Sequence, residues 1–176
     1  MAPLGSPLPD ITLPDLAGQP VNVSHYAGGH PLLVVFAANH CPYVKWVEST
    51  LADVVAAHPE VRVVAINSND TDEYPDDGPA GMQEQIDRAG WNFPYLLDES
   101  QDVAREFGAA CTPDFFLYSA DGRLAYRGAF DTSSPKNGNP LNGELLDAAL
   151  TLVEAGREVP EPHRPSMGCS VKWKQS

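Results

Sequence analysis

Three cysteines are the residues in this sequence best suited to chemistry, and Cys41 has the most informative surroundings. It follows an apolar run, residues 31–37, that is typical of a buried strand, and it precedes valines and leucines spaced like one face of a helix. In the first turn of a helix a cysteine meets unpaired backbone amides and the positive end of the macrodipole, which favour the thiolate. Pro42 suits the first helical position because it has no N–H to satisfy. These features predict a nucleophilic thiolate at Cys41, and the alternative is a small buried hydrophobic residue.

The strand, cysteine and helix resemble the thioredoxin superfamily, in which a Cys-x-x-Cys motif opens the helix after a central strand. Phe36 and Lys45 match that pattern, and the run Cys41-Pro42-Tyr43 is also found in glutaredoxins. Val44 stands in place of the second cysteine, so the motif itself cannot form a disulfide. The resemblance implies a redox-active Cys41 whose disulfide partner comes from another part of the chain or from an external thiol.

A second cysteine lies close to a proline in the segment Cys111-Thr112-Pro113, which we interpret as a loop that enters a strand at the proline. In the thioredoxin fold this proline is cis and lies beside the reactive cysteine. The resemblance therefore implies that Thr112 and Pro113 line the substrate groove and that Cys111, at its rim, is a candidate resolving thiol. The alternative is a structural or exposed thiol, because a disulfide requires the two Cα atoms to come within about 7 Å.

The third cysteine, Cys169, lies in a C-terminal tail with three prolines between residues 160 and 165, which exclude a helix there. Val171 and Trp173 suggest that this tail docks on the rest of the protein. If it docks near the helix after Cys41, Cys169 becomes a second candidate resolving thiol. Otherwise it is a spare or structural thiol.

The neighbours of Cys41 are candidates for substrate binding. As a cation, His40 would stabilise the thiolate, although adjacent residues often point apart, and its alternative role is structural. Pro42 and Tyr43 would face the substrate together with Thr112 and Pro113, in the groove that the resemblance implies. This groove would hold a partner chain by main-chain hydrogen bonds.

Composition limits the classes of function. With 24 acidic and 11 basic residues the formal net charge is −13, which argues against binding to nucleic acids and to anionic membranes. The N-terminus has neither a basic nor an apolar leader region, and the cysteines are sparse, so we expect a cytoplasmic protein. An acidic stretch between residues 70 and 77 is interpreted as a solvated loop rather than a cation site, because its spacing does not match an EF-hand. We predict no metal and no cofactor.

Strand and helix patterns alternate along the chain, which predicts an α/β fold. The N-terminal hairpin and an extra strand and helix at 93–107 resemble the redoxin branch of thioredoxin-like proteins, which includes alkyl hydroperoxide reductases and thiol-specific antioxidant proteins. The resemblance implies a three-layer α/β/α sandwich at 1–158 with a docked tail at 159–176. The expected strands are 11–13, 21–23, 31–37, 61–66, 95–97, the run after Pro113, and 124–128; the expected helices are Cys41 to about 58, 81–89, 100–107 with Ser100 as N-cap, and 142–155.

Three functions fit these features. In the first, Cys41 attacks disulfides of proteins or small molecules and an external thiol regenerates it. In the second, Cys41 reduces hydroperoxides. Peroxidatic cysteines usually follow a threonine or serine by three residues, but Ala38 occupies that position, so Asn39 or His40 would have to donate to the peroxide. The third is a binding module without turnover, with one variant that holds an iron–sulfur cluster through a single cysteine and glutathione.

Overall fold

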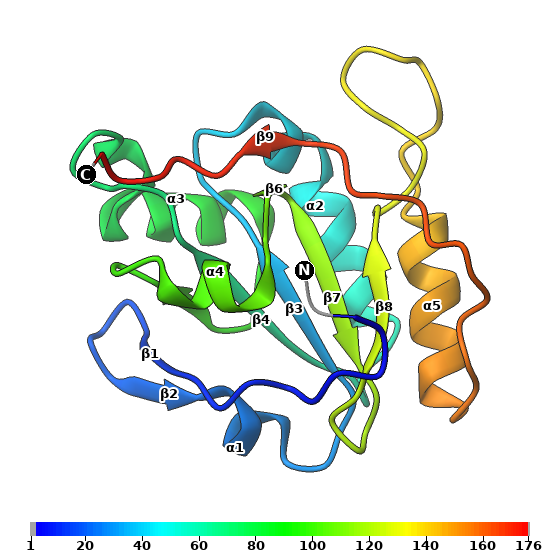
Figure 1. Cartoon of the computed structure of the whole chain (residues 1–176). Coiled ribbons are helices and arrows are strands. Elements are labelled where there is room, and N and C mark those ends of the chain that lie inside the picture. The colour runs from blue at the N-terminus through cyan, green and yellow to red at the C-terminus, as the bar shows by residue number, and fades with distance from the viewer. Residues whose placement is uncertain (1–2, 176) are drawn as a thin grey trace.

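A five-stranded mixed sheet forms the centre of the protein in the computed structural model, which describes residues 3–175. Its strand order is β5-β4-β3-β7-β8 (Figure 1). Strands β3, β4 and β5 are parallel, and β7 and β8 continue the sheet as antiparallel strands. The strands are β3 (Leu32–Phe36), β4 (Arg62–Asn67), β5 (Tyr95–Leu97), β7 (Asp114–Tyr118) and β8 (Leu124–Gly128), as the apolar runs predicted.

Helices cover both faces of this sheet and make the three layers expected from the sequence. Helices α2 (Pro42–Ala56), α3 (Pro79–Ala89) and α5 (Glu144–Glu154) pack on one face. Helices α1 (Val23–Ala27) and α4 (Asp102–Phe107) pack on the other, with the N-terminal hairpin. Alternate residues of β3 enter the two cores, as a buried strand requires, which is why the whole strand is apolar.

Helix α2 follows β3 closely and fixes the position of Cys41. Its buried face carries Val44, Val47 and Leu51, spaced as the sequence predicted, and Pro42 occupies its first turn. The link between β3 and α2 is short, so Cys41 lies at the C-terminal end of the central strand.

The N-terminal hairpin differs from the sequence prediction in its second strand. Strand β1 (Thr12–Pro14) pairs with β2 (Pro20–Asn22), and α1 begins directly afterwards, where we expected the strand to continue. The side chain of Asn22 accepts a hydrogen bond from the backbone N–H of His25 at 2.9 Å and caps this helix.

The predicted N-cap residue of α4 was also wrong. Gln101, with φ of 68°, is the N-cap residue instead of Ser100. The buried carboxylate of Asp98 accepts the N–H of Ala104 at 2.9 Å and satisfies the start of the helix from outside it. The hydroxyl of Ser100 accepts the N–H of Asp102 at 3.2 Å, so Ser100 and Asp98 both accept from the first turn although neither is the N-cap residue.

Two short strands that the sequence did not indicate connect the tail to the rest of the fold. Strand β6 (Cys111–Thr112) pairs with β9 (Cys169–Ser170) in antiparallel register, with Thr112 opposite Cys169. Figure 1 shows the C-terminal segment, in red, crossing the sheet end beside the start of α2. Farther along, Val171 is buried, and the Arg105 guanidinium lies 4.8 Å from the ring centre of Trp173.

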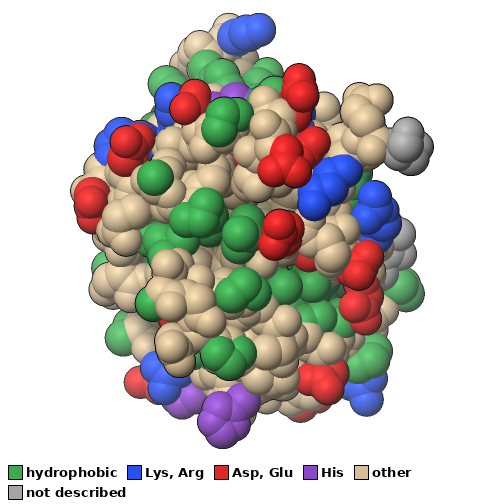
Figure 2. Space-filling view, turned by 90° about the vertical axis from the view of Figure 1, so that its left-hand side faces the viewer, with side chains coloured by type: hydrophobic (Ala, Val, Ile, Leu, Met, Phe, Trp, Pro, Cys, Tyr) green, Lys and Arg blue, Asp and Glu red, His purple; other side chains and the backbone are tan. Residues whose placement is uncertain are grey.

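Acidic and basic side chains are interspersed over the face that Figure 2 shows, with small apolar areas between them. Within residues 3–175, none of the helices is both long enough and apolar enough to cross a membrane.

Candidate redox site

Cys41 is the N-cap residue of α2 and is almost completely buried, with 1% of its surface exposed. Its Sγ donates to the carbonyl oxygen of Thr112 at 3.3 Å. The same sulfur lies 2.8 Å from Sγ of Cys169. On two-electron oxidation, two thiols at this separation need only a small shift to form a disulfide, so the site contains a dithiol built from the start of α2 and from the C-terminal segment.

Strand pairing between β6 and β9 holds Cys169 in this place. Gly168 allows the close approach, because a Cβ atom there would lie 2.1 Å from the carbonyl oxygen of Thr112. Burial, and then the adjacent Cys41, raise the pKa of the Cys169 thiol to about 11, although the Tyr43 N–H and Lys172 act in the opposite direction. Cys169 is partly exposed, whereas Cys41 lies behind it.

Cys111 does not join this pair. Its Sγ lies 3.7 Å from the carbonyl oxygen of Pro113 and faces a cavity that also contains Asp114 and Arg127. In residues 3–175 no hydrogen bond connects it to either of the other sulfurs. Burial, with a smaller effect of Asp114, raises the pKa of the Cys111 thiol to about 12, which keeps it protonated at neutral pH.

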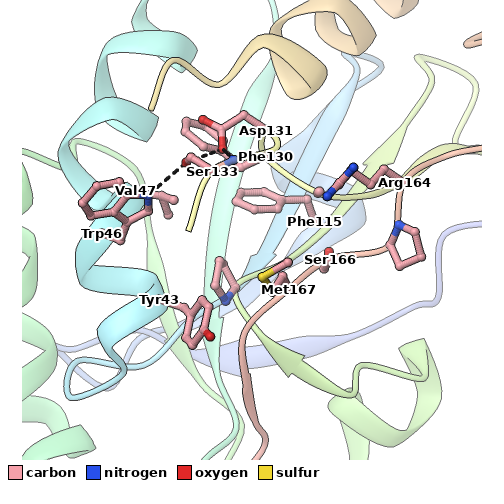
Figure 3. A pocket seen from close by; sticks show the side chains of 13 residues that line it. Tyr43, Trp46, Val47, Phe115, Phe130, Asp131, Ser133, Arg164, Ser166 and Met167 are labelled. Carbon is pink, nitrogen blue, oxygen red and sulfur yellow. Dashed lines mark hydrogen bonds between the residues drawn. The ribbon is translucent and has the colours of Figure 1, made fainter. Parts of the chain in front are cut away.

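Thr112 and Pro113 lie where the resemblance placed them, next to Cys41. The peptide bond between them is cis, and the Thr112 side chain is buried. Pro113 also lines a narrow pocket with Tyr43, Trp46 and Met167 (Figure 3). Backbone groups of Thr112 and Tyr43 therefore lie at the two sulfurs and Pro113 follows Thr112, whereas Pro42 is exposed at the start of α2.

His40 is held by a buried carboxylate. Its backbone N–H donates to Oδ1 of Asp77 at 2.9 Å, and its ring Nδ1 contacts Oδ2 of the same residue. The ring stacks on Tyr74 at 5.2 Å between centroids, with an angle of 4° between the planes. The carboxylate of Asp77 thus fixes both the backbone and the ring of the residue before Cys41.

Asp77 is the site residue that the sequence interpretation missed. The acidic stretch was expected to be a solvated loop, but its end forms the 3₁₀ turn η1 (Pro75–Asp77), and Asp77 is completely buried. Besides holding His40, its carboxylate accepts from Nδ2 of Asn69 at 3.0 Å. The order of the strands was the one indication that this loop lies at the site. The loop follows β4, and the C-terminal end of β4 lies beside that of β3 because the two strands are parallel.

Asn39 is occupied by other partners. Its Nδ2 donates to the carbonyl oxygen of Asp76 at 2.9 Å, and its Oδ1 accepts from Arg88 at 2.9 Å. Arg88 also pairs with the buried Glu48 at 3.1 Å. Burial raises the pKa of Glu48, and Arg88 limits that rise. Asn39 therefore ties the loop before Cys41 to η1 and α3, and Arg88 extends this connection to Glu48 of α2.

The residues described form no cluster of three histidine, cysteine or acidic side chains that could hold a metal ion. The chemistry that this arrangement supports is exchange between thiols and disulfides at Cys41 and Cys169.

A mixed sheet with a cysteine at the start of the helix after its central strand, beside a cis proline, is the arrangement of the thioredoxin fold. The family model described as the AhpC/TSA family matches residues 4–127. The chain belongs to this family.

Solved structures agree with this assignment. An uncharacterized conserved protein from Geobacillus kaustophilus is 42% identical, with a TM-score of 0.95 over 100% of this chain and 95% of that one. A hypothetical protein from Sinorhizobium meliloti is 39% identical, with a TM-score of 0.95 over 100% of this chain and 97% of the other. A comparison with curated proteins found no match.

More distant structures share the fold. A secreted disulfide oxidoreductase from Mycobacterium tuberculosis is 22% identical, with a TM-score of 0.65 over 81% of this chain and 95% of that one. The peroxidoxin BcpB from the same organism is 20% identical, with a TM-score of 0.64 over 88% of this chain and 98% of the other. The fold thus carries both kinds of thiol chemistry in these neighbours.

Proposed function

We propose that this protein is a thiol-disulfide oxidoreductase in which Cys41 is the nucleophile and Cys169 is the resolving thiol. The observation that carries the proposal is the 2.8 Å separation of the two sulfurs beside the Thr112 carbonyl. Cys111 was the first candidate from the sequence for the resolving role. Its thiol contacts the carbonyl oxygen of Pro113 and neither of the other sulfurs among the residues described, so we assign that role to Cys169.

The reaction proceeds by two exchanges. The Cys41 thiolate attacks one sulfur of a disulfide, forms a mixed disulfide and releases the other sulfur as a thiolate. Cys169 then gives up its proton to the released thiolate or to solvent and attacks the Cys41 sulfur, which forms the Cys41–Cys169 disulfide and releases the second thiolate. An external dithiol reduces this bond, becomes a disulfide itself and restores both cysteines.

Peroxide reduction has less support at this site. Ala38 offers no hydroxyl, and the Asn39 amide donates to a backbone carbonyl instead of facing the thiol. The backbone N–H of His40 is engaged by Asp77. The Asn39 amide and the backbone N–H of His40 thus already have acceptors within the protein, which favours the disulfide reaction. A paired dithiol likewise favours turnover over a passive binding role.

We also propose the substrates, the reductant and the cellular compartment of the enzyme. Its substrates are disulfides and its reductant is an external thiol. The net charge of −13 argues against a nucleic-acid or membrane partner, and the sparse cysteines favour the cytoplasm.

Single cysteine variants test the proposal with bis(2-hydroxyethyl) disulfide as substrate and dithiothreitol as reductant. We expect Cys41→Ser to abolish catalysis and Cys169→Ser to accumulate a mixed disulfide on Cys41. Cys111→Ser is the matched control and should retain most of the wild-type rate. A Cys169→Ser variant with normal turnover and no trapped adduct would exclude Cys169 from the reaction.

A further inference from the structure

The backbone edge beside Thr112 is already occupied by the protein's own chain. Strand β9 pairs with β6, so that Cys169 lies opposite Thr112 and Ser170 lies opposite Cys111. An extended peptide that binds by strand addition needs free backbone groups on the edge strand. Here β9 takes the place of such a peptide and presents its own cysteine to Cys41.

The segment after Cys169 is anchored by polar contacts. Gln101 donates from Nε2 to the carbonyl oxygen of Lys172 at 2.9 Å and accepts the N–H of Lys174 at 2.9 Å. Asn69 Oδ1 accepts the N–H of Lys172 at 2.9 Å. Val171 between these contacts is buried. Removal of β9 from the edge would break all of these interactions.

The segment before Cys169 is anchored as well. Ser166 Oγ donates to the carbonyl oxygen of Gly128 at 2.6 Å, and the carbonyl oxygen of Arg164 accepts the N–H of Ala129 at 2.8 Å. The strand is therefore fixed on both sides of the reactive sulfur, and Gly168 presses it against Thr112.

A small molecule meets a different obstacle from a peptide. Cys41 is 1% exposed and lies behind the partly exposed Cys169. Rotation of the Cys169 side chain about χ1 would move its sulfur away from Cys41 without displacing β9, since cysteine has a single short rotor. A polypeptide substrate would instead have to displace the whole β9 strand and its anchors.

We infer that β9 is a built-in ligand of the peptide-binding edge, which restricts the enzyme to low-molecular-weight disulfides and excludes disulfides within protein chains. This inference rests on the proposed exchange at Cys41 and Cys169.

The test compares two substrates, bis(2-hydroxyethyl) disulfide and insulin, in the presence of dithiothreitol and with the uncatalysed rates subtracted. The wild-type protein should accelerate reduction of the small disulfide by at least about tenfold and leave insulin reduction at its uncatalysed rate. Insulin reduction by the wild type at a comparable rate per disulfide would overturn the inference. Absence of acceleration with both substrates, with no Cys41–Cys169 disulfide formed, would instead overturn the proposed function beneath it.

A tail-release variant makes the second part of the test. Gln101→Ala combined with Val171→Asp removes anchors beyond Cys169 and leaves all three cysteines in place. Faster tryptic cleavage after Lys172, with an unchanged far-UV circular dichroism spectrum, verifies release. We expect insulin reduction to rise at least about fivefold. The control is Gln83→Ala, whose amide contacts only Asp87 on the same helix, and it should behave like the wild type.

If the double variant unfolds, Gly168→Ala provides the same test, because its Cβ atom would collide with the Thr112 carbonyl and push β9 from the edge. A released tail without a gain in insulin reduction would show that β9 does not determine the substrate class.

Discussion

Asp77 shows how much a single buried side chain contributes to this site. It holds the N–H and the ring of His40 and the side chain of Asn69, and none of its surface is exposed. A carboxylate in this position organises two consecutive loops at the C-terminal edge of the sheet. The position of Cys41 depends on these contacts, because they hold the preceding residue, His40.

Replacement of Asp77 by asparagine should therefore destabilise the protein. Asparagine has about the same shape but cannot accept hydrogen bonds at both terminal atoms, so at least one buried donor loses its partner. We expect the free energy of unfolding to fall by about 1–3 kcal/mol in urea titrations. Asp76→Asn is the control, because Asp76 is exposed and contributes its backbone carbonyl to Asn39. Equal stability of the two variants would contradict this role of Asp77.

Residue identities could be predicted where local sequence determines the environment. Cys41 was found because a buried strand and an amphipathic helix meet at it, and Pro113 because an X-Pro step precedes an apolar run. Asp77 was missed because nothing local distinguishes it from its exposed acidic neighbours. Asp77 is buried because β3 and β4 are neighbours in the sheet, and this feature of the tertiary structure is not visible in the local sequence.

The helices are joined at their ends as well as through the core. His58, just after α2, contacts two acidic residues of α5: Nε2 lies 2.7 Å from Oδ1 of Asp147, and Nδ1 contacts Glu154. Burial alone would lower the pKa of His58, but these hydrogen bonds and charges outweigh it and raise the pKa. Both ring nitrogens face carboxylates, which suits the imidazolium form.

This contact predicts a pH-dependent stability. Because the folded-state pKa is raised, the contribution of His58 is complete below the unfolded value of about 6.5 and is lost as pH rises through the folded value. We expect His58→Gln to lower the free energy of unfolding by about 1–2 kcal/mol at pH 5.5, with a smaller difference at pH 9. Urea titrations of both proteins at the two pH values measure this. A difference that grows toward alkaline pH would refute the ion-pair explanation.

Elements were predictable in proportion to their length. The strands and helices of the central sandwich carry clear apolar periods and were recognised. Helix α1 and the pair β6 and β9 were not, because no apolar run or period marks them, whereas short apolar runs did mark the three-residue strands β1, β2 and β5. The pairing of β6 with β9 also joins residues far apart in sequence, which no local pattern encodes.

At the scale of the whole molecule, the C-terminal segment closes the site as well as supplying a cysteine. It adds a strand to β6, buries Val171 and contacts the loops after β4 and β5 through Asn69 and Gln101. The C-terminal segment thus lies beside Cys41.

A chain that ends at residue 163 should keep the central sheet but lose stability. Burial of Val171 alone is worth about 1.5–3 kcal/mol, and each lost hydrogen bond adds about 1 kcal/mol. We expect the free energy of unfolding to fall by about 3 kcal/mol or more, with a nearly unchanged far-UV circular dichroism spectrum. An unchanged urea midpoint would mean that the segment is not part of the folded unit.

The architecture was the most predictable level, because strand and helix patterns alternate along the chain and their order resembles one fold. The pairing of cysteines was not, because the sequence left Cys111, Cys169 and an external thiol as alternatives. The structure places the sulfur of Cys169 against that of Cys41, whereas the thiol of Cys111 contacts the carbonyl oxygen of Pro113, and on this basis we propose Cys169.

The most direct measurement is to map the disulfide that forms when the fully reduced protein is treated with one equivalent of a small disulfide. Alkylation of the remaining thiols, proteolysis and mass spectrometry identify the linked peptides. We predict an intramolecular bond between Cys41 and Cys169, with Cys111 alkylated. A bond between Cys41 and Cys111, or a stable adduct on Cys41 with Cys169 left free, would contradict the dithiol proposed here.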